Sequence, residues 1–293
     1  MKCWVISFCL AYACFFATKG NAQVNMFPSH FGQVMLSRQS LNPALPNLER
    51  ATNFTVSNRF YTGPYSKIDN LYFIGNVNLN GKDSARYVNS LGVRFVNERE
   101  GEFIERPRCY VSYAIRTRVL ETYWLALGIE VGRAWYLFKG SDVSTAGSAS
   151  NWDGNVGIVF SNSTTCLAAS VNQLFNSLVL PKDLYFRWAR FYTLHAEKRV
   201  ETGQVEFSFY AQNQFLPDRD DVLDIGTNAT LSKVFFLGVN AWVGRSISFQ
   251  VGLPDIYLEG HHFSLYASYN APAFNQTSAN IQSFEMSLRY RFK

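Results

Sequence analysis

Strict alternation of apolar and polar residues is the feature of this sequence that most constrains its fold. The last strand-like segment alternates the apolar residues Phe284, Met286, Leu288, Tyr290 and Phe292 with Glu285, Ser287, Arg289 and Arg291. Successive side chains of a β-strand point to opposite faces, so the pattern predicts a strand with one apolar and one polar face. Such a strand fits a barrel wall between lipid and an aqueous lumen, and also a half-buried sheet of a soluble protein.

The alternation recurs along most of the chain, and this repetition favours the barrel. We expect about fourteen strands, each near the ~9–11 residues that cross a bilayer when tilted. They lie near residues 53–61, 70–79, 87–97, 107–117, 122–133, 153–161, 166–175, 185–198, 204–213, 222–231, 234–243, 246–253, 263–270 and 282–292. An even number of strands returns both ends of the barrel to one side, which is the periplasm in bacterial barrels.

The connections between these segments alternate in length, as outer-membrane barrels require. Long outer loops are expected at 62–69, 98–105, 138–152, 176–184, 214–221 and 271–281, and short periplasmic turns at 80–86, 118–121, 162–165, 199–203 and 232–233. One pair departs from the rule, because 244–245 is short for an outer loop and 254–262 is long for a turn. A misplaced strand in this region would explain the departure.

A soluble β-sandwich is the structural alternative. It would show shorter segments and polar outward faces, whereas here the apolar face is rich in aromatics and long apolar edges would aggregate in solution. Charged residues make up 17% of the chain, below the ~25% of soluble proteins, and aromatics make up 16%. We therefore predict an all-β fold, a transmembrane antiparallel β-barrel with a short N-terminal lead-in outside the barrel.

The N-terminal residues have the layout of a secretory signal peptide. Lys2 precedes an almost wholly apolar run from Trp4 to Phe16, and small residues lie just before Gln23. The run is shorter than the ~20 residues of a spanning helix. We expect export to the bacterial outer membrane and three parts of the chain, namely a signal peptide over 1–22, a periplasmic or plug-like lead-in over 23–50, and the barrel over 51–293.

Charged side chains on the polar faces are expected to point into the lumen. These lumen-facing residues are Arg94, Glu130, Arg187, His195, Glu206 and Arg289. They carry both signs, so they either neutralise one another or line a pore, and mixed charge gives no ion-selectivity signature. About fourteen strands give a bore between filled eight-strand barrels and open porins. We favour a mostly closed, structural barrel, with a porin-like solute channel as the alternative.

His195 is the residue on which an enzymatic hypothesis would depend. An outer-membrane lipid hydrolase would pair it with a serine nucleophile, but no G-x-S-x-G motif is present. A lumenal histidine in a hydrogen-bond network is the simpler interpretation. We expect no catalytic residue and no enzyme activity, and keep the lipid hydrolase as a second alternative.

No residue pattern predicts a metal, a cofactor or a nucleic-acid partner. Neighbouring His261 and His262 would point to opposite faces of a strand. The acidic cluster of Asp218, Asp220, Asp221 and Asp224 lacks the spacing of a 12-residue calcium loop. Nucleic-acid binding would want a clustered basic patch, and the sequence contains no long run of Lys or Arg.

Several stretches, in order along the chain, resemble one protein family. They are Phe31–Met35 followed by Leu41–Ala44, Asp153–Ile158 with Ala169–Leu174, Phe236–Val239, and Tyr266–Asn270 with Ser283–Phe292. Together they resemble the PorP/SprF family, outer-membrane barrels associated with type IX secretion and gliding motility in Bacteroidota. The family-motif residues are Asn42, Pro43, Ala44, Asp153, Gly157, Tyr269, Glu285, Tyr290 and Phe292. The sequence departs from the family pattern after Asn-Pro-Ala, where Leu45 follows instead of an early glycine.

This resemblance implies a non-catalytic role in protein transport. Such barrels either anchor the secretion and gliding machinery or help a large secreted adhesin reach and stay on the surface. The implied partners are outer-membrane lipid and either secretion-machinery proteins of the periplasm or outer membrane, the adhesin, or both. The outer loops are expected to face a secreted partner, and residues 23–50 with the periplasmic turns to face machinery.

Overall fold

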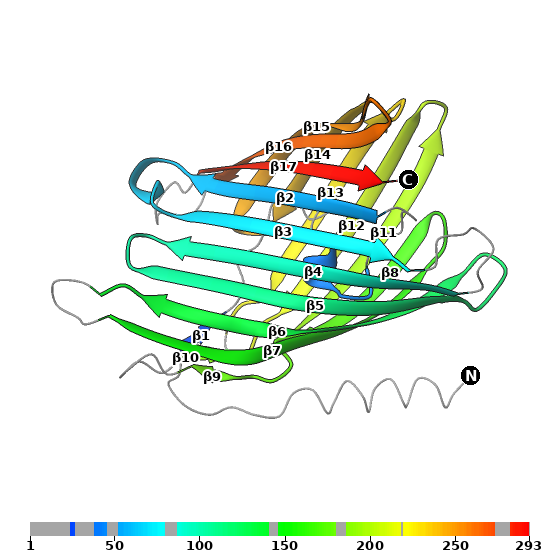
Figure 1. Ribbon diagram of the computed structural model, residues 1–293. Coiled ribbons are helices and arrows are strands. Elements are labelled where there is room, and N and C mark those ends of the chain that lie inside the picture. The colour runs from blue at the N-terminus through cyan, green and yellow to red at the C-terminus, as the bar shows by residue number, and fades with distance from the viewer. Residues whose placement is uncertain are drawn as a thin grey trace.

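Fourteen antiparallel strands close into a single barrel in the computed structural model (Figure 1). The structure describes residues 24–26, 38–45, 52–79, 87–140, 146–179, 186–217, 219–272 and 282–292, so the signal-peptide prediction over 1–22 lies outside the described residues. The barrel strands are β2 (Thr52–Tyr61), β3 (Asp69–Asn78), β4 (Tyr87–Glu100), β5 (Ile104–Arg118), β6 (Trp124–Phe138), β7 (Gly147–Ser161), β8 (Thr165–Asn172), β11 (Phe191–Thr202), β12 (Val205–Phe215), β13 (Val222–Leu231), β14 (Phe235–Trp242), β15 (Ser246–Leu258), β16 (His261–Pro272) and β17 (Ser283–Phe292). β17 pairs with β2 and closes the barrel.

The predicted fold class and strand number are confirmed, and three local predictions are wrong. β15 continues to Leu258 through a register irregularity between Leu253 and Ile256, so the expected long turn over 254–262 is mostly strand. The segment expected as one strand over 185–198 is broken after Trp188, and only its second part belongs to the barrel. Only residues 259–260 link β15 to β16. The long outer loop expected over 98–105 is reduced to residues 101–103, because β4 and β5 extend beyond their predicted bounds.

The two ends of the barrel differ in their connections. The loop end carries the connections 62–68, 101–103, 139–146, 173–190, 216–221, 243–245 and 273–282. The turn end carries 79–86, 119–123, 162–164, 203–204, 232–234 and 259–260, and β2 begins and β17 ends there. Outer-membrane barrels have short periplasmic turns and longer outer loops, so the turn end corresponds to the periplasmic side of such a barrel.

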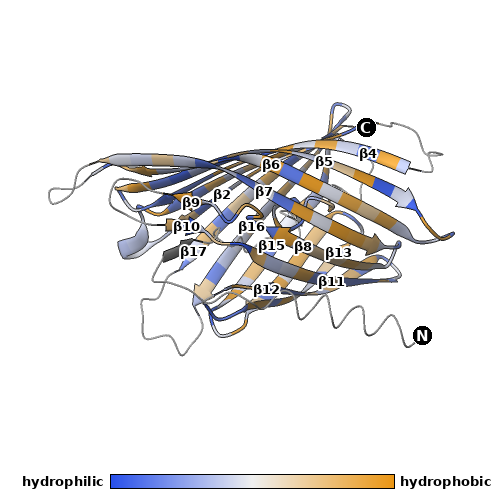
Figure 2. Cartoon of the chain, turned by 90° about the horizontal axis from the view of Figure 1, so that it is seen from below, coloured by the Kyte–Doolittle hydropathy of each residue, from blue (hydrophilic) through white to orange (hydrophobic). Residues whose placement is uncertain are grey.

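Hydrophobic and hydrophilic residues alternate along the barrel strands (Figure 2), and the exposed ones are mostly apolar while the buried ones are mostly polar. On β17, Met286 is 52% exposed while its neighbour Glu285 is 1% exposed. On β6, Ile129 and Val131 point outward and flank the buried Glu130. This distribution of apolar and polar side chains is the reverse of that in a soluble protein, and it is expected where lipid covers the outer face. None of the described helices is long and apolar enough to cross a membrane.

The N-terminal segments lie at the loop end and inside the barrel. β1 (Val24–Met26) pairs in parallel with β10 (Phe186–Trp188), and β10 pairs with β9 (Leu178–Val179), so a small sheet forms within the 173–190 connection (Figure 1). The short helix α2 (Arg38–Leu41) lies within the barrel, whereas η1 (Gly63–Tyr65) belongs to a loop-end connection. The described N-terminal segments thus lie at three levels, with β1 at the loop end, α2 in the lumen and the start of β2 at the turn end.

Candidate functional site: a plug seated in the lumen

Residues 38–45 form a plug against the inner wall. Gln39, Asn42, Ala44 and Leu45 are each less than 5% exposed. An isolated four-residue helix has no stability of its own in water, so side-chain contacts with the wall must hold the plug in place. Two rows of wall residues, each crossing several strands in register, provide these contacts.

The first row contacts Gln39 through two polar side chains on either side of a glycine. Its members face one another across β3 to β7 in the order Asn76, Gly92, Ser112, Glu130 and Asn155. Asn76 Nδ2 donates to Gln39 Oε1 at 2.6 Å, and Gln39 Nε2 donates to Ser112 Oγ at 2.8 Å. A Cβ on Gly92 would lie 2.5 Å from Gln39 Nε2, so this position needs glycine for the amide to approach the wall.

The second row is built from small residues and receives the turn that follows α2. Ala114, Gly128, Gly157 and Ser170 face one another in register across β5 to β8. A Cβ on Gly128 would overlap the backbone of Pro43 and Ala44, and one on Gly157 would overlap Asn42. The absence of a Cβ lets the plug approach the wall closely, and Ser170 Oγ donates to Leu41 O at 2.6 Å.

Asn42 links this turn to the wall. Its Nδ2 donates to Ala169 O at 2.9 Å and to Ile158 O at 3.3 Å, while its Oδ1 accepts from Ala44 N at 2.8 Å. A hydrogen bond between an asparagine side chain and the backbone N–H two residues later is typical of a turn. The proline that follows the asparagine has a fixed φ that suits the second position of a turn. Asn-Pro-Ala therefore makes a compact turn that uses every polar atom of the Asn42 side chain.

A small apolar cluster completes the seat toward the turn end. Ala44 and Leu45 pack there with Ala126, Val159, Cys166 and Ala168. Because Ala126, Val159 and Ala168 form the next register row of the same wall, the plug lies along successive rows of β6, β7 and β8. An apolar stretch of the inner wall thus lies against the apolar end of the plug.

A buried ionic network lies beside the plug on the loop-end side. Arg94 on β4 donates through two nitrogens to Glu130 on β6, and Nε lies 2.9 Å from Oε1. Asn155 donates to the same carboxylate, and the Arg94 guanidinium lies 4.2 Å from the ring centre of Tyr110. Tyr110 in turn donates to Asp153 at 2.7 Å. Bidentate pairing and extra hydrogen bonds are what a buried ion pair requires to offset its desolvation.

The lumen is also filled nearer the loop end. Trp188 of β10 is fully buried and packs with Ala134, Tyr136 and Val179. The guanidinium of Arg108 lies 5.5 Å from the Trp188 ring, and its Nη2 lies 2.6 Å from Glu98 Oε2. Val179 and Trp188 of the 173–190 connection therefore pack on the inner wall, so that the plug and these parts of the connection both occupy the lumen.

The residues expected to face the lumen fall into four places. Arg94 and Glu130 meet in the buried network, and His195 stacks on Tyr210 with Nε2 3.7 Å from Glu197 Oε2. Glu206 and Arg289 line a cavity at the turn end. Arg187 lies on β10 of the loop-end sheet instead of on a barrel strand, because the strand breaks before β11.

The family-motif residues form two groups in the structure. Asn42 contacts the wall at Gly157, whereas Pro43 and Ala44 contact it at Gly128. Asp153 lies four residues before Gly157 on β7. The other group is the closing hairpin, where Tyr290 contacts Phe292 at 4.4 Å and donates to or accepts from His261 Nδ1 at 2.6 Å. Tyr269 packs on Phe284, and Glu285 is buried in the lumen wall.

Sequence reasoning missed several residues that hold the plug. They are Gln39, Gly92, Gly128 and Ser170. Glycines at inward positions of predicted strands were the available signal, since they mark close approach of another backbone as well as bulges. Within the described residues, no group of three or more His, Cys, Asp or Glu side chains could hold a metal ion.

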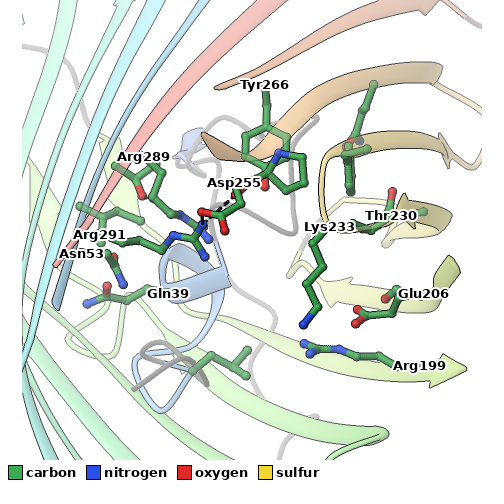
Figure 3. Close-up of a pocket in the computed structure, with 18 of the residues that line it drawn as sticks. Gln39, Asn53, Arg199, Glu206, Thr230, Lys233, Asp255, Tyr266, Arg289 and Arg291 are labelled. Carbon is green, nitrogen blue, oxygen red and sulfur yellow. Dashed lines mark hydrogen bonds and ion pairs between the residues drawn. The ribbon is translucent and has the colours of Figure 1, made fainter. Parts of the chain in front are cut away.

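Two cavities lie on the turn-end side of the plug, and we call them together the vestibule. One has a volume of about 370 Å³ and includes Gln39 and Leu45 in its lining (Figure 3). The other has a volume of about 410 Å³ and includes Ala44 in its lining. The plug thus forms part of the wall of both cavities. Arg199 lines both of them.

A closed antiparallel barrel with an apolar outer face, a polar interior and a segment seated in its lumen defines an outer-membrane β-barrel protein. The chain matches the family described as type IX secretion system membrane protein PorP/SprF over residues 24–290, and it belongs to that family. The resemblance inferred from the motifs is therefore confirmed. No curated protein matches the sequence.

Solved structures with a similar fold are transport barrels of distant sequence. The Ralstonia pickettii toluene transporter TbuX is 10% identical, with a TM-score of 0.53 over 94% of this chain and 96% of that one. The TodX deltaS2S3 mutant monoaromatic hydrocarbon channel is 9% identical, with a TM-score of 0.52 over 93% and 96%. The P. putida toluene transporter TodX is 10% identical, with a TM-score of 0.50 over 93% and 95%. At such identities the likeness concerns the fold alone.

Proposed function

We propose that this protein is a non-catalytic outer-membrane barrel that supports type IX secretion as a platform for other proteins, with its lumen closed to solutes by its own plug. The observation that carries the proposal is the seating of residues 38–45 on two register rows of the wall. A segment held by long-range hydrogen bonds and by glycine contacts is a fixed part of the structure. A barrel filled in this way is better suited to bind other proteins at its two ends than to let solutes pass through its lumen.

Each end then has its own partner. After removal of a signal peptide before Gln23, β1 lies at the outer side with the 173–190 connection, where a large secreted adhesin would be displayed. The turn end faces the periplasm, where the secretion and gliding machinery would be anchored. In this arrangement residues 24–26 face outward with the loops, while the turn end alone meets the machinery.

The absence of catalysis in this proposal is supported by the surroundings of His195. Its ring is buried, and neither ring nitrogen has a hydrogen-bond partner among the described residues. Ser208 Oγ donates to Glu197 at 3.0 Å, and no serine hydroxyl of the described residues bonds to the His195 ring. A serine hydrolase needs the nucleophile bonded to the histidine, so the lipid-hydrolase alternative has no geometric support.

A solute channel is the second candidate, because the similar solved structures are named as hydrocarbon transporters and channels. The likeness is one of fold alone, so it does not identify any residue of this chain as part of a transport route. The plug and the buried Trp188 both occupy space that a route along the barrel axis would need. The scaffold is therefore the better supported of the two.

Deletion of the gene, with quantification of the surface proteome and of secreted proteins, tests the proposal. The expected result is loss of one or more surface proteins, restored by the wild-type gene, with gliding impaired where the cells glide. A secretome and motility identical to those of the parent strain would show that the protein has no part in type IX secretion.

A further inference from the structure

The vestibule at the turn end is lined by an excess of positive charge. The lining residues of its two cavities include the cations Arg116, Arg199, Lys233, Arg289 and Arg291 and the acids Glu206 and Asp255, which gives 5 − 2 = +3. Glu197 lies behind Arg199, with Arg199 Nε 2.8 Å from Glu197 Oε1, and counting it leaves +2. Figure 3 shows Arg289, Arg291 and Asp255 on one side of the first cavity, with Lys233, Arg199 and Glu206 on the other.

The cations are spread around the barrel instead of converging on one point. Arg116 lies on β5 and stacks 4.5 Å from the Trp124 ring centre, Arg199 lies on β11, and Arg289 and Arg291 lie on β17. A single small anion needs several donors at one place. Charges distributed over opposite walls, with cavities in the 300–1,000 Å³ range of ligand pockets, suit an extended segment with several negative groups.

Lys233 provides a second, independent observation. It follows Ser232 in the β13–β14 turn, where Val234 N donates to Leu231 O at 2.9 Å. Both central residues have positive φ, 49° for Ser232 and 60° for Lys233. Glycine is favoured in that conformation, and another residue costs about 1–2 kcal/mol. Lys233 forms no ion pair within the part of the chain that the structure describes, so the turn places a costly, unpaired cation at the mouth of the vestibule.

We infer that the vestibule is the docking site for an acidic segment of a periplasmic protein. This inference rests on the proposed function, in which the turn end meets the secretion machinery. Membrane lipid has no access to the site, because the closed barrel wall separates the lumen from the bilayer. The Asn53 amide and the Thr230 hydroxyl also line the cavity and can bond the backbone of a bound peptide. Since Gln39, Ala44 and Leu45 form part of its wall, a docked segment would contact the plug.

Two substitutions change the charge of the vestibule in opposite directions with little effect on folding. Lys233→Gly removes a cation and places the favoured residue at a positive φ, so the turn becomes easier to form. Glu206→Gln removes an acid and keeps the shape of the side chain. Lys139→Ala is the matched control, because it removes one cation at the loop end, where Lys139 pairs with Glu105 at 2.6 Å.

The test measures binding of a fluorescent hexaglutamate peptide to the full-length protein in detergent or nanodiscs. We expect saturable binding of the peptide that weakens as salt is added. The affinity should fall roughly threefold in Lys233→Gly and rise by a similar factor in Glu206→Gln, which is the effect of one surface charge. Lys139→Ala should bind the peptide as the wild-type protein does. Equal binding of a hexaglutamine peptide, or equal effects of Lys139→Ala and Lys233→Gly, would overturn the inference. Displacement by inorganic phosphate at the same concentration as peptide would also overturn it, because the site would then take a single anion.

A cell experiment separates this inference from the proposed function. The deletion strain is complemented with the gene for the wild-type protein or for Lys233→Gly, and secretion is compared between the two complemented strains. Reduced secretion at normal protein level supports docking at the vestibule. Full secretion by a variant that has lost peptide binding overturns the docking site and leaves the secretion role standing, whereas an unaffected deletion strain removes the secretion role itself.

Discussion

Asn42 and Gly157, 115 positions apart in the sequence, are in direct contact in the lumen, and a Cβ on Gly157 would occupy the position of the Asn42 side-chain amide. Both residues were singled out as family motifs for separate reasons, one in the lead-in and one in the central hairpin. Their contact gives the two motifs a single structural purpose, which is to seat the plug on the wall. Gly128, directly opposite Gly157 in register, extends the same seat.

Gly157→Ala should displace the plug and leave the barrel closed. The added methyl group overlaps Asn42, and overpacking of this kind costs about 1–3 kcal/mol. The measurement is urea unfolding of the folded protein in lipid or detergent, together with protease sensitivity of the N-terminal segment. We expect a lower unfolding midpoint and faster cleavage of residues before β2.

Gly238→Ala is the matched control for that experiment. Gly238 lies on β14, and its added methyl group would meet the side chains of Asn228 and Gln250, away from the plug. It should change the protease sensitivity of the N-terminal segment little. Equal cleavage of both variants would mean that the barrel is loosened generally and that Gly157 has no special part in holding the plug.

The Arg94–Glu130 pair predicts a strong asymmetry between single and double substitutions. Glu130→Ala leaves the Arg94 guanidinium buried without its carboxylate, which typically costs about 3–5 kcal/mol. Replacing both residues by apolar ones, Arg94→Met with Glu130→Leu, should recover much of that loss of unfolding free energy. A double variant no more stable than Glu130→Ala would contradict the assignment of a coupled buried pair. Glu102→Ala, in the exposed Lys67–Glu102 pair, should have little effect.

Arginine on the outer face tests the assignment of lipid contact. Val131 lies in the middle of β6 and points outward, whereas Leu258 lies outward at the turn end of β15. Val131→Arg should cost about 2–4 kcal/mol of unfolding free energy in lipid, and Leu258→Arg only about 0–1 kcal/mol. Similar costs at the two positions would argue against a bilayer centred on the barrel wall.

A disulfide tests the position of the plug directly. Ala44 and Ala126 belong to one buried cluster, so Ala44→Cys with Ala126→Cys, in a background with Cys109 and Cys166 replaced by alanine, should cross-link on mild oxidation. Ala126→Cys with Val159→Cys, which face each other across β6 and β7, serves as the positive control. Cross-linking of the control pair alone would place the plug elsewhere.

The architecture could be predicted because it depends on local periodicity. The alternation in Phe284–Phe292 can be recognised without knowing which strands pair with it. The predicted bounds of β13 agree with the observed strand Val222–Leu231. The prediction failed where the period is interrupted. Pro254 and the register irregularity before Ile256 break the alternation in β15, although Pro254 O still accepts from Ser264 Oγ at 2.7 Å.

The plug seat could not be predicted because it depends on contacts between distant segments. Nothing near Gly92 or Gly157 in the sequence indicates that Gln39 or Asn42 lies against it. Glycine in a strand equally marks a bulge or a weak point, and only the register that places Gly128 opposite Gly157 reveals a continuous seat. The lead-in was expected to be periplasmic or plug-like, and its partner on the wall was unknown.

Single-channel recording in planar lipid bilayers tests the central claim most directly, namely that the protein's own plug closes the lumen. The wild-type protein should show no steady conductance. The double variant Gln39→Ala Asn42→Ala, which loses the hydrogen bonds of the plug to Asn76, Ser112 and Ala169, should show frequent openings. Gln212→Ala, a buried lumenal amide on β12, should stay silent. Steady conductance of the wild-type protein, unchanged in the double variant, would contradict the account and favour a solute channel.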